Sequence, residues 1–400
     1  MRESKERLLN VDALRGFALF GILAVNIWSF ADPYFASGVN NPRYASALDM
    51  AVRFIVALLF EAKFYLLFSF LFGYSFMLQA WAAERAGAAF RPRMLRRAAG
   101  LLLLGGLHGC FLFYGDILHL YGLLSFLLLV WYGREWDGRR WRSAECAALL
   151  LMLAAFMLVV LGVVVMLSPQ AGPPELKAVF AKLAAFHGDA RSTQAFIMDE
   201  FPSTVAFLMF GQGPSALAMF LLGLGAGRAH LLERVGSIEQ LVRPILRLAA
   251  TFGLVGALLY AAASEFAPGG VLMIFSTALS YLTAPILTAA YVVVLMLLFE
   301  SRRGARLIAA LAPMGKLALS NYLMQSLVMA LLFTGYGMRL CDELPPIAVL
   351  ALVPAIYLAQ MALSAWWLKH YTYGPAEWLL RAITNWQWLP QEAGAQPPSR

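Results

Sequence analysis

Ten stretches of this 400-residue chain are apolar over about 18 or more residues, and they constrain the fold more than any other feature. With 61% hydrophobic and 14% charged residues, the chain has more apolar surface than a soluble core requires. We predict an all-α, polytopic membrane bundle of about ten transmembrane helices in one domain, residues 1–388. The predicted spans are 11–31, 54–80, 95–114, 116–133, 144–167, 205–227, 246–264, 271–299, 308–333 and 346–368.

The connections between these stretches alternate in charge. Twenty-three of the 31 Lys and Arg residues fall in one set of connections and in the termini. The opposite connections hold only Arg43, Arg53, Lys177, Lys182, Arg191 and Arg339. Because short basic loops stay in the cytoplasm, both termini are predicted to be cytoplasmic. The net charge of +8 then reflects topology in a lipid bilayer, and we expect no nucleic-acid partner.

Signatures of soluble enzymes and metal sites are missing from the sequence. It has no P-loop, no GxGxxG after a strand and no GxSxG, and its three cysteines give neither a disulfide framework nor a zinc spacing. The first apolar stretch lacks a small-residue cleavage site, so we expect it to be retained. The connection 168–204 is predicted to be external with a short helix around 175–186, and the tail 389–400 to be disordered. Any chemistry is therefore expected inside the bundle or at its ends.

The first span carries polar residues that hydrocarbon disfavours by about 3 kcal/mol each when ionised. Asp12 and Arg15 are three residues apart and can pair on one helix face. Asn26 returns to that face three turns later, towards the outer side. The alternative is that Arg15 extends to lipid phosphate with Asp12 as its local partner.

A denser cluster lies in GGLHGCFLFYGDILHLYG, which predicts an outer helical hairpin closing near Asp116. His108 precedes the corner, and His119 follows Asp116 by three residues, on the same face. A carboxylate beside an imidazole fixes its tautomer and raises its basicity, as a general base requires. The alternative is a structural clasp, with Asp116 capping a helix and His108 bonded to a backbone carbonyl.

Further polar residues leave two interpretations open. Lys63 either anchors the second span at the headgroups or points into a site. The run 211–215 interrupts a span, so it must face protein or water and can line a cavity. In the ninth predicted span, Asn321, Tyr322 and Gln325 either reach a substrate or join helices by hydrogen bonds.

At the inner end, the segment RPRMLRR places Arg93, Arg96 and Arg97 before the third span. Anionic lipid and cytoplasmic topology explain such residues in most membrane proteins. The alternative is a site for a phosphate-rich cytoplasmic ligand.

Five motifs in this order resemble the YeiB-like (DUF418) family of bacterial inner-membrane proteins: NVDALRGFALFGILAVNI, AKFYLLFSFLFGYSF, RRAAGLLLLGGLHGCFLFYGDILHLYGLL, GKLALSNYLMQS and YGPAEWLLRAIT. The resemblance implies a multi-pass protein of the bacterial inner (plasma) membrane. The first motif is also similar to the opening helix of transmembrane acyltransferases, including acetylases of bacterial surface polysaccharides and the lysosomal heparan-α-glucosaminide N-acetyltransferase.

That wider resemblance implies transfer of an acyl group from cytoplasmic acyl-CoA to an acceptor on the far side. Arg15 matches the Arg of the first-helix motif, but Asn26 stands where the polysaccharide acetylases have a His. His108 would then be the base and Asp116 its orienting partner. Asn26 or Lys63 would donate to the oxyanion, and Arg15 and the inner arginines would hold the phosphates. The acceptor would be a glycan or a lipid-linked molecule.

Two other interpretations stay open at this point. In a transporter or lipid flippase, the same polar residues would form a substrate or proton path. In a membrane scaffold without catalysis, they would only join helices.

Overall fold

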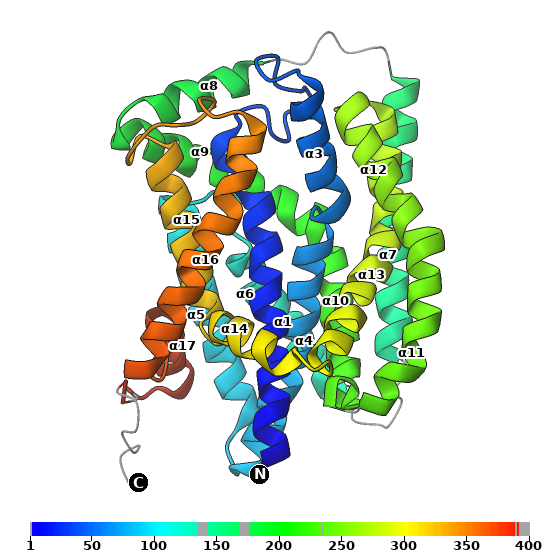
Figure 1. The fold of residues 1–400 in the computed structure, drawn as a ribbon, viewed down its shortest axis with the longest axis vertical. Coiled ribbons are helices and arrows are strands. Elements are labelled where there is room, and N and C mark those ends of the chain that lie inside the picture. Colours follow the sequence, from blue (N-terminus) through cyan, green and yellow to red (C-terminus); the bar gives the residue numbers. More distant parts are fainter. Residues whose placement is uncertain (1, 135–141, 169–175, 234, 389, 392–400) are drawn as a thin grey trace.

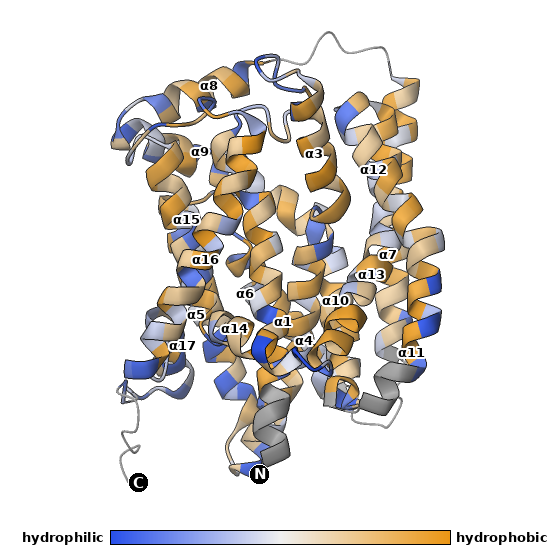
Figure 2. Ribbon diagram, viewed as in Figure 1, coloured by the Kyte–Doolittle hydropathy of each residue, from blue (hydrophilic) through white to orange (hydrophobic). Residues whose placement is uncertain are grey.

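The computed structural model describes residues 2–134, 142–168, 176–233, 235–388 and 390–391, and its regular elements are helices. They lie side by side in one bundle, with the start of α1 and the helix α17 at the same end (Figure 1). We call this end the inner end and the opposite end the outer end, after the orientation predicted from the sequence. Apolar residues dominate the middle of the bundle, and polar residues gather towards both ends (Figure 2). The predicted all-α polytopic fold is confirmed. Of the tail expected to be disordered, only 390–391 lie within the described residues.

Fewer segments cross the bundle than the sequence suggested. Seven are long and apolar enough to span a membrane, and an eighth span is formed if two helices bent by 76° count as one. The expected number of about ten was therefore too high. The seven are Leu9–Ala31, Ala47–Arg85, Ser143–Leu167, Ala190–Arg228, Gln240–Phe266, Val271–Phe299 and Pro346–His370; the bent pair is Gly304–Lys316 with Ala318–Phe333.

Several spans consist of more than one helix. The helices that form these spans are, in chain order, α1 (Arg2–Asn26), α2 (Trp28–Ala31), α3 (Ala47–Leu59), α4 (Lys63–Arg85), α7 (Arg142–Leu167), α9 (Ala190–Phe207), α10 (Gly213–Arg228), α11 (Val235–Leu248), α12 (Leu254–Phe266), α13 (Val271–Phe299), α14 (Gly304–Lys316), α15 (Ala318–Phe333) and α16 (Pro346–His370). Single π-helical turns join α9 to α10 and α11 to α12. At the outer end, α8 (Lys177–His187) confirms the short helix expected in the long external connection.

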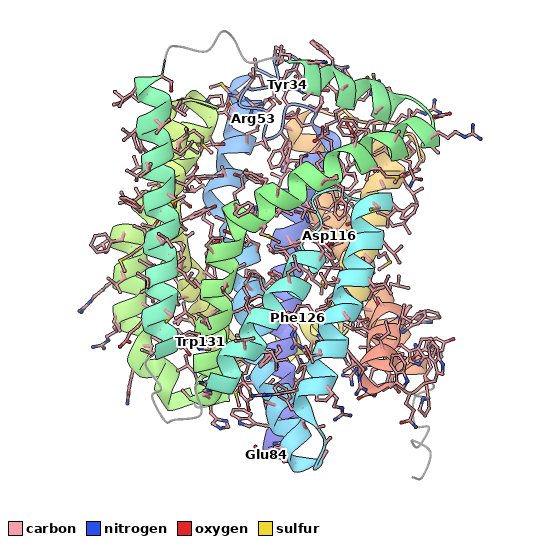
Figure 3. All side chains as sticks on the ribbon, turned by 180° about the vertical axis from the view of Figure 1, so that it is seen from behind. Tyr34, Arg53, Glu84, Asp116, Phe126 and Trp131 are labelled. Atoms are coloured by element: carbon pink, nitrogen blue, oxygen red, sulfur yellow. The ribbon has the colours of Figure 1, made fainter. Side chains whose placement is uncertain are left out.

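The two missing spans form a hairpin that turns inside the bundle. It consists of α5 (Phe90–Phe111) and α6 (Leu118–Arg134). Four arginines occupy the first turns of α5, and the 17 residues of α6 measure about 26 Å, less than the roughly 30 Å of a hydrocarbon core. Figure 3 places Asp116, at the corner, well inside the bundle, with Tyr34 and Arg53 nearer the outer end. The sequence suggested a corner at the outer end of the bundle. In the structure the corner lies inside the bundle instead.

Helix α1 lies at the centre of the bundle, where Leu14, Leu19 and Leu23 are fully buried. Near the inner end it crosses α14 almost in backbone contact. A Cβ on Gly315 would lie 1.7 Å from the carbonyl oxygen of Asp12, so only glycine permits this approach. The inner end of α1 is therefore fixed by close packing.

Candidate functional site

Asp116 lies at the centre of a buried cluster with two imidazoles. Its Oδ1 is 2.7 Å from Nδ1 of His108, and its Oδ2 is 3.2 Å from Nδ1 of His119. The three side chains are 0–7% exposed. The predicted contact of His108 with Asp116 is confirmed, and so is that of Asp116 with His119.

Local sequence explains why the cluster forms. Asp116 Oδ2 accepts a hydrogen bond of 2.9 Å from the backbone N–H of His119 and thereby caps the start of α6. Gly105 on α5 allows α6 to approach, since a Cβ there would lie 2.3 Å from the His119 nitrogen. The capping role that we considered as an alternative is therefore real, and it coexists with the bond to His108.

The second nitrogen of each imidazole is left unused. Nε2 of His108 and Nε2 of His119 are buried and have no hydrogen-bond partner among the described residues. With Nδ1–H of His108 donating to an ionised Asp116, its Nε2 carries a lone pair. The His108 ring packs against Tyr322 at 5.2 Å between centroids, and the His119 ring against Phe201 at 5.5 Å. This is the arrangement of a base whose orientation is fixed and whose basic atom is unoccupied.

A cavity of about 830 Å³ fills the outer half of the bundle beside this cluster. Gly115 and Ile117, on either side of Asp116, line it, and so does Tyr322. His108 itself is not part of the lining. The Tyr322 hydroxyl is buried near Asp116 and has no hydrogen bond of good geometry among the described residues. His108 therefore lies directly behind the lining of the cavity, with its ring packed against that of Tyr322.

The polar residues of α1 divide between the two ends, as expected. Arg15 Nη1 donates to Asp12 at 2.7 Å, which confirms their pairing, and Arg15 Nη2 donates to Ser75 on α4. Asn26 lines the outer cavity, and its amide has no hydrogen-bond partner among the described residues. Arg15 is thus engaged inside the bundle, whereas Asn26 is available to a ligand.

Lys63 does not lie where either interpretation expected. It is 1% exposed, and its Nζ donates to the carbonyl of Ala57 at 2.8 Å, at the break between α3 and α4. Lys63 therefore donates a hydrogen bond to a carbonyl group near the end of α3, and it is absent from the cavity lining. Glu61, two residues earlier, does line the cavity and accepts a 2.8 Å hydrogen bond from the Tyr260 hydroxyl.

Asn321 and Gln325 join helices. Asn321 Nδ2 donates to Ser364 at 2.9 Å, and Gln325 Nε2 donates to Gln360 Oε1 at 3.0 Å, both across to α16. Gln360 returns a hydrogen bond of 3.1 Å to the Asn321 carbonyl. Of the three polar residues expected in this span, only Tyr322 contacts both the cluster and the cavity.

The arginines of the inner end have different roles. Arg93 Nη2 donates to Asn385 at 2.6 Å and Arg96 Nε to the Thr384 carbonyl at 3.0 Å, so both hold α17 (Pro375–Asn385). Arg97 has a buried Nε without a partner among the described residues, and lies near Arg15 and Arg381. None of these five arginines lines the outer cavity. Of Arg93, Arg96 and Arg97, only Arg97 has a buried donor without a partner among the described residues.

Carboxylates at the inner and outer ends are held by hydrogen bonds. Glu377 of α17 accepts from the backbone N–H groups of Leu319 and Ser320 at 2.7 and 3.1 Å, capping α15, and burial raises its pKa. At the outer surface, the hydrogen bond from Arg43 lowers the pKa of Glu343. These contacts are structural.

Three ionisable residues at the cavity were not predicted from the sequence to be site residues. Arg53 and Glu265 are 212 positions apart and form a double hydrogen bond of 2.9 and 2.6 Å beneath the outer loops. The third is Glu61, which lines the cavity between α3 and α4. An ionisable residue at a break between apolar segments was the available signal. The described residues contain no group of three or more His, Cys, Asp or Glu arranged to hold a metal.

Residues 226–387 match the model of a family described as "Protein of unknown function (DUF418)". Three relatives cover nearly the whole chain. The chain is 28% identical to "Uncharacterized protein YxaH" of Bacillus subtilis (strain 168), over 97% of this chain and 96% of the relative. It is 30% identical to "Uncharacterized 39.9 kDa protein in amylase 3'region" of Bacillus acidopullulyticus, over 95% and 94%. It is 28% identical to "Uncharacterized protein YeiB" of Escherichia coli (strain K12), over 95% and 96%.

Proposed function

The chain belongs to the DUF418 (YeiB-like) family, and from its geometry we propose that it is a transmembrane acyltransferase of the bacterial inner membrane. The acyl group comes from cytoplasmic acyl-CoA and passes to a hydroxyl or amine on the outer side. The observation that supports this most is the buried His108–Asp116 pair, with an unoccupied Nε2, behind a cavity of the outer half.

The chemistry assigns one role to each residue. Nε2 of His108 takes the proton of the acceptor's hydroxyl or amine while the acceptor's oxygen or nitrogen attacks the thioester carbonyl. Asp116 holds the imidazole in the required tautomer and stabilises its charged form. The tetrahedral intermediate collapses, the C–S bond breaks, and the proton on His108 passes to the leaving CoA thiolate. The Asn26 amide, free in the cavity, is the candidate donor to the oxyanion.

The donor's anionic end would bind at the inner end of the bundle. The buried Nε of Arg97 has no partner among the described residues, and Arg15 and Arg381 lie close enough to add to the positive electrostatic potential around it. Arg93 and Arg96 are already used to hold α17. We therefore assign phosphate binding to Arg97 with Arg15 and Arg381, rather than to the whole arginine cluster.

The test uses membrane vesicles with their cytoplasmic face outward and acetyl-CoA labelled in the acetyl group. We expect CoA thiol release and label in envelope material, both lowered about 10²- to 10⁴-fold by His108→Gln. The control is His370→Gln, an exposed histidine at the end of α16. If acetyl-CoA neither stabilises the purified native protein nor is consumed by the vesicles, the proposal is wrong.

A transporter is the second candidate, because discontinuous helices line the cavity. The break between α3 and α4 contributes Glu61 and Ala62, and the π-helical turn before α10 contributes Leu208 and Gln212. Broken helices at membrane depth are typical of transporter binding sites. A transporter would expose the cavity alternately to both sides, so labelling of a cavity cysteine from the cytoplasmic side would favour it.

A further inference from the structure

We propose that the outer cavity binds an uncharged, hydroxyl-rich molecule through the carboxylate of Glu61 and discriminates against anions. The inference rests on the proposed function only where it identifies this molecule as the acyl acceptor. The binding chemistry itself follows from how charges are arranged around the cavity.

Glu61 presents an unused hydrogen-bond acceptor to the cavity. It lies between α3 and α4, where Ala62 has a φ of 66° and the helix is interrupted. Its Oε2 accepts from the Tyr260 hydroxyl, whereas its Oε1 has no hydrogen bond among the described residues. A carboxylate at membrane depth is costly and calls for a functional explanation.

The cations near Glu61 and Asp32 do not lie in the lining. Lys63 is close to Glu61 and lies 5.8 Å from the centre of the Tyr260 ring, but its Nζ is bonded to Ala57. Lys182 stands beside Asp32 in the same manner, with its Nζ 3.1 Å from the Asp32 carbonyl. The negative groups therefore face the ligand, and the positive groups face the protein.

Arg53 is the one cation in the described lining, and each of its three nitrogens already donates a hydrogen bond. Nε and Nη2 bind the two oxygens of Glu265, and Nη1 donates to the Tyr44 carbonyl at 2.8 Å. An anionic ligand would therefore meet the Glu61 carboxylate and a guanidinium whose charge is already paired with Glu265. Lys63, close to Glu61, weakens the attraction of a cation and the repulsion of an anion alike.

The remaining free groups suit hydroxyls. Several neutral polar side chains of the lining make no hydrogen bond among the described residues, and they include Asn26, Tyr114, Gln212 and Ser264. They come from α1, the hairpin corner, the π-helical turn and α12. Together with Glu61 they offer donors and acceptors in several directions, which a molecule with several hydroxyl groups can satisfy at once.

The experiment measures charge selectivity directly, without a known ligand. Ser264 lies one helical turn from Tyr260 and lines the cavity, so Ser264→Cys places a nearly isosteric thiol there. The background replaces Cys110, Cys146 and Cys341 by alanine. The full chain in lipid nanodiscs reacts with three methanethiosulfonates: 2-hydroxyethyl (neutral), 2-sulfonatoethyl (anionic) and 2-trimethylammonioethyl (cationic). Ala45→Cys, exposed on an outer loop, gives the reference rates.

We expect the neutral-to-anionic rate ratio at position 264 to exceed that at position 45 by about tenfold, the effect of a nearby carboxylate at low effective dielectric. Adding Glu61→Gln should reduce the excess to about threefold or less. Adding Glu343→Gln, which removes an outer carboxylate away from the cavity, should not reduce this excess.

Equal rates for the anionic and neutral reagents would overturn the proposal, as would an unchanged ratio in Glu61→Gln. A cationic reagent more than about tenfold faster than the neutral one would indicate a cation site instead. If Glu61→Gln does not fold, the rate ratios at positions 264 and 45, measured with Glu61 intact, still test the proposal. His108→Gln is expected to leave the ratios unchanged while abolishing acyl transfer, so each proposal can fail alone.

Discussion

The outer half and the inner end of this bundle use their polar residues in opposite ways. In the outer half, Asn26, Glu61 and His108 each have an atom without a hydrogen-bond partner among the described residues, around or beside a large cavity. At the inner end, Arg15 and Arg93 are bound to neighbouring helices, and Gly315 brings α14 almost into contact with α1. Unsatisfied groups in a membrane are costly, so we infer that the outer half holds the chemistry and the inner end mainly holds the fold.

The largest effect should come from the packed inner end. Gly315→Ala places a Cβ 1.7 Å from the Asp12 carbonyl oxygen, and relief requires α1 and α14 to separate. We expect loss of the monodisperse peak in size-exclusion chromatography. Gly106→Ala is the control, because a Cβ there meets nothing within 4 Å. Normal behaviour of Gly315→Ala would mean that this crossing is less constrained than the structure indicates.

In the outer half, Asp116→Asn should affect activity more than folding. An amide still caps α6, but it cannot stabilise a charged His108 or select its tautomer. We expect acetyl transfer to fall about 10²- to 10⁴-fold with unchanged acetyl-CoA affinity. Glu343→Gln serves as the carboxylate control. Activity within a few-fold of the native protein would assign the cluster a structural role.

Two arginines test whether the inner end has any binding function. Removing a hydrogen bond to a charged group costs about 1.5–3 kcal/mol, so Arg97→Gln should raise the Kd for acetyl-CoA about tenfold or more. Arg93→Gln should leave that Kd unchanged but release α17, increasing amide exchange in 375–385. Isothermal titration and hydrogen exchange measure the two effects. The reverse pattern would contradict the division of roles among the arginines.

The smallest effect compares two amide side chains, Gln360 and Asn26. Gln360→Leu removes hydrogen bonds to Gln325 and Asn321, each worth about 0.6 kcal/mol and at most about 1.7 kcal/mol inside a membrane protein. Asn26→Leu breaks no hydrogen bond between described residues. We expect a small loss of thermal stability in the first variant and none in the second. Equal losses would show that Asn26 also joins helices.

The sequence was informative where residues interact locally. Asp12 with Arg15 and Asp116 with His119 are three residues apart, so helical geometry alone predicts that they can meet. The resemblance of the motifs also identified the family. Hydropathy, however, overestimated the spans, because an apolar run such as α6 reads the same whether it crosses the bilayer or turns within it.

Long-range partners could not be predicted in this way. Arg53 meets Glu265, and Arg93 meets Asn385, only because distant helices pack together. Lys63 is the clearest case, since a broken helix supplies the Ala57 carbonyl that its charge binds. The cavity likewise depends on side chains from six or more elements, and no single segment encodes it.

The most direct test of the account is a cryo-electron microscopy structure with a non-hydrolysable acetyl-CoA analogue. We predict that the nucleotide end of the analogue binds at Arg97. The acetyl group should lie at the outer cavity, close to Nε2 of His108. An analogue whose acetyl group ends among the inner helices, remote from His108 and Asp116, would contradict it.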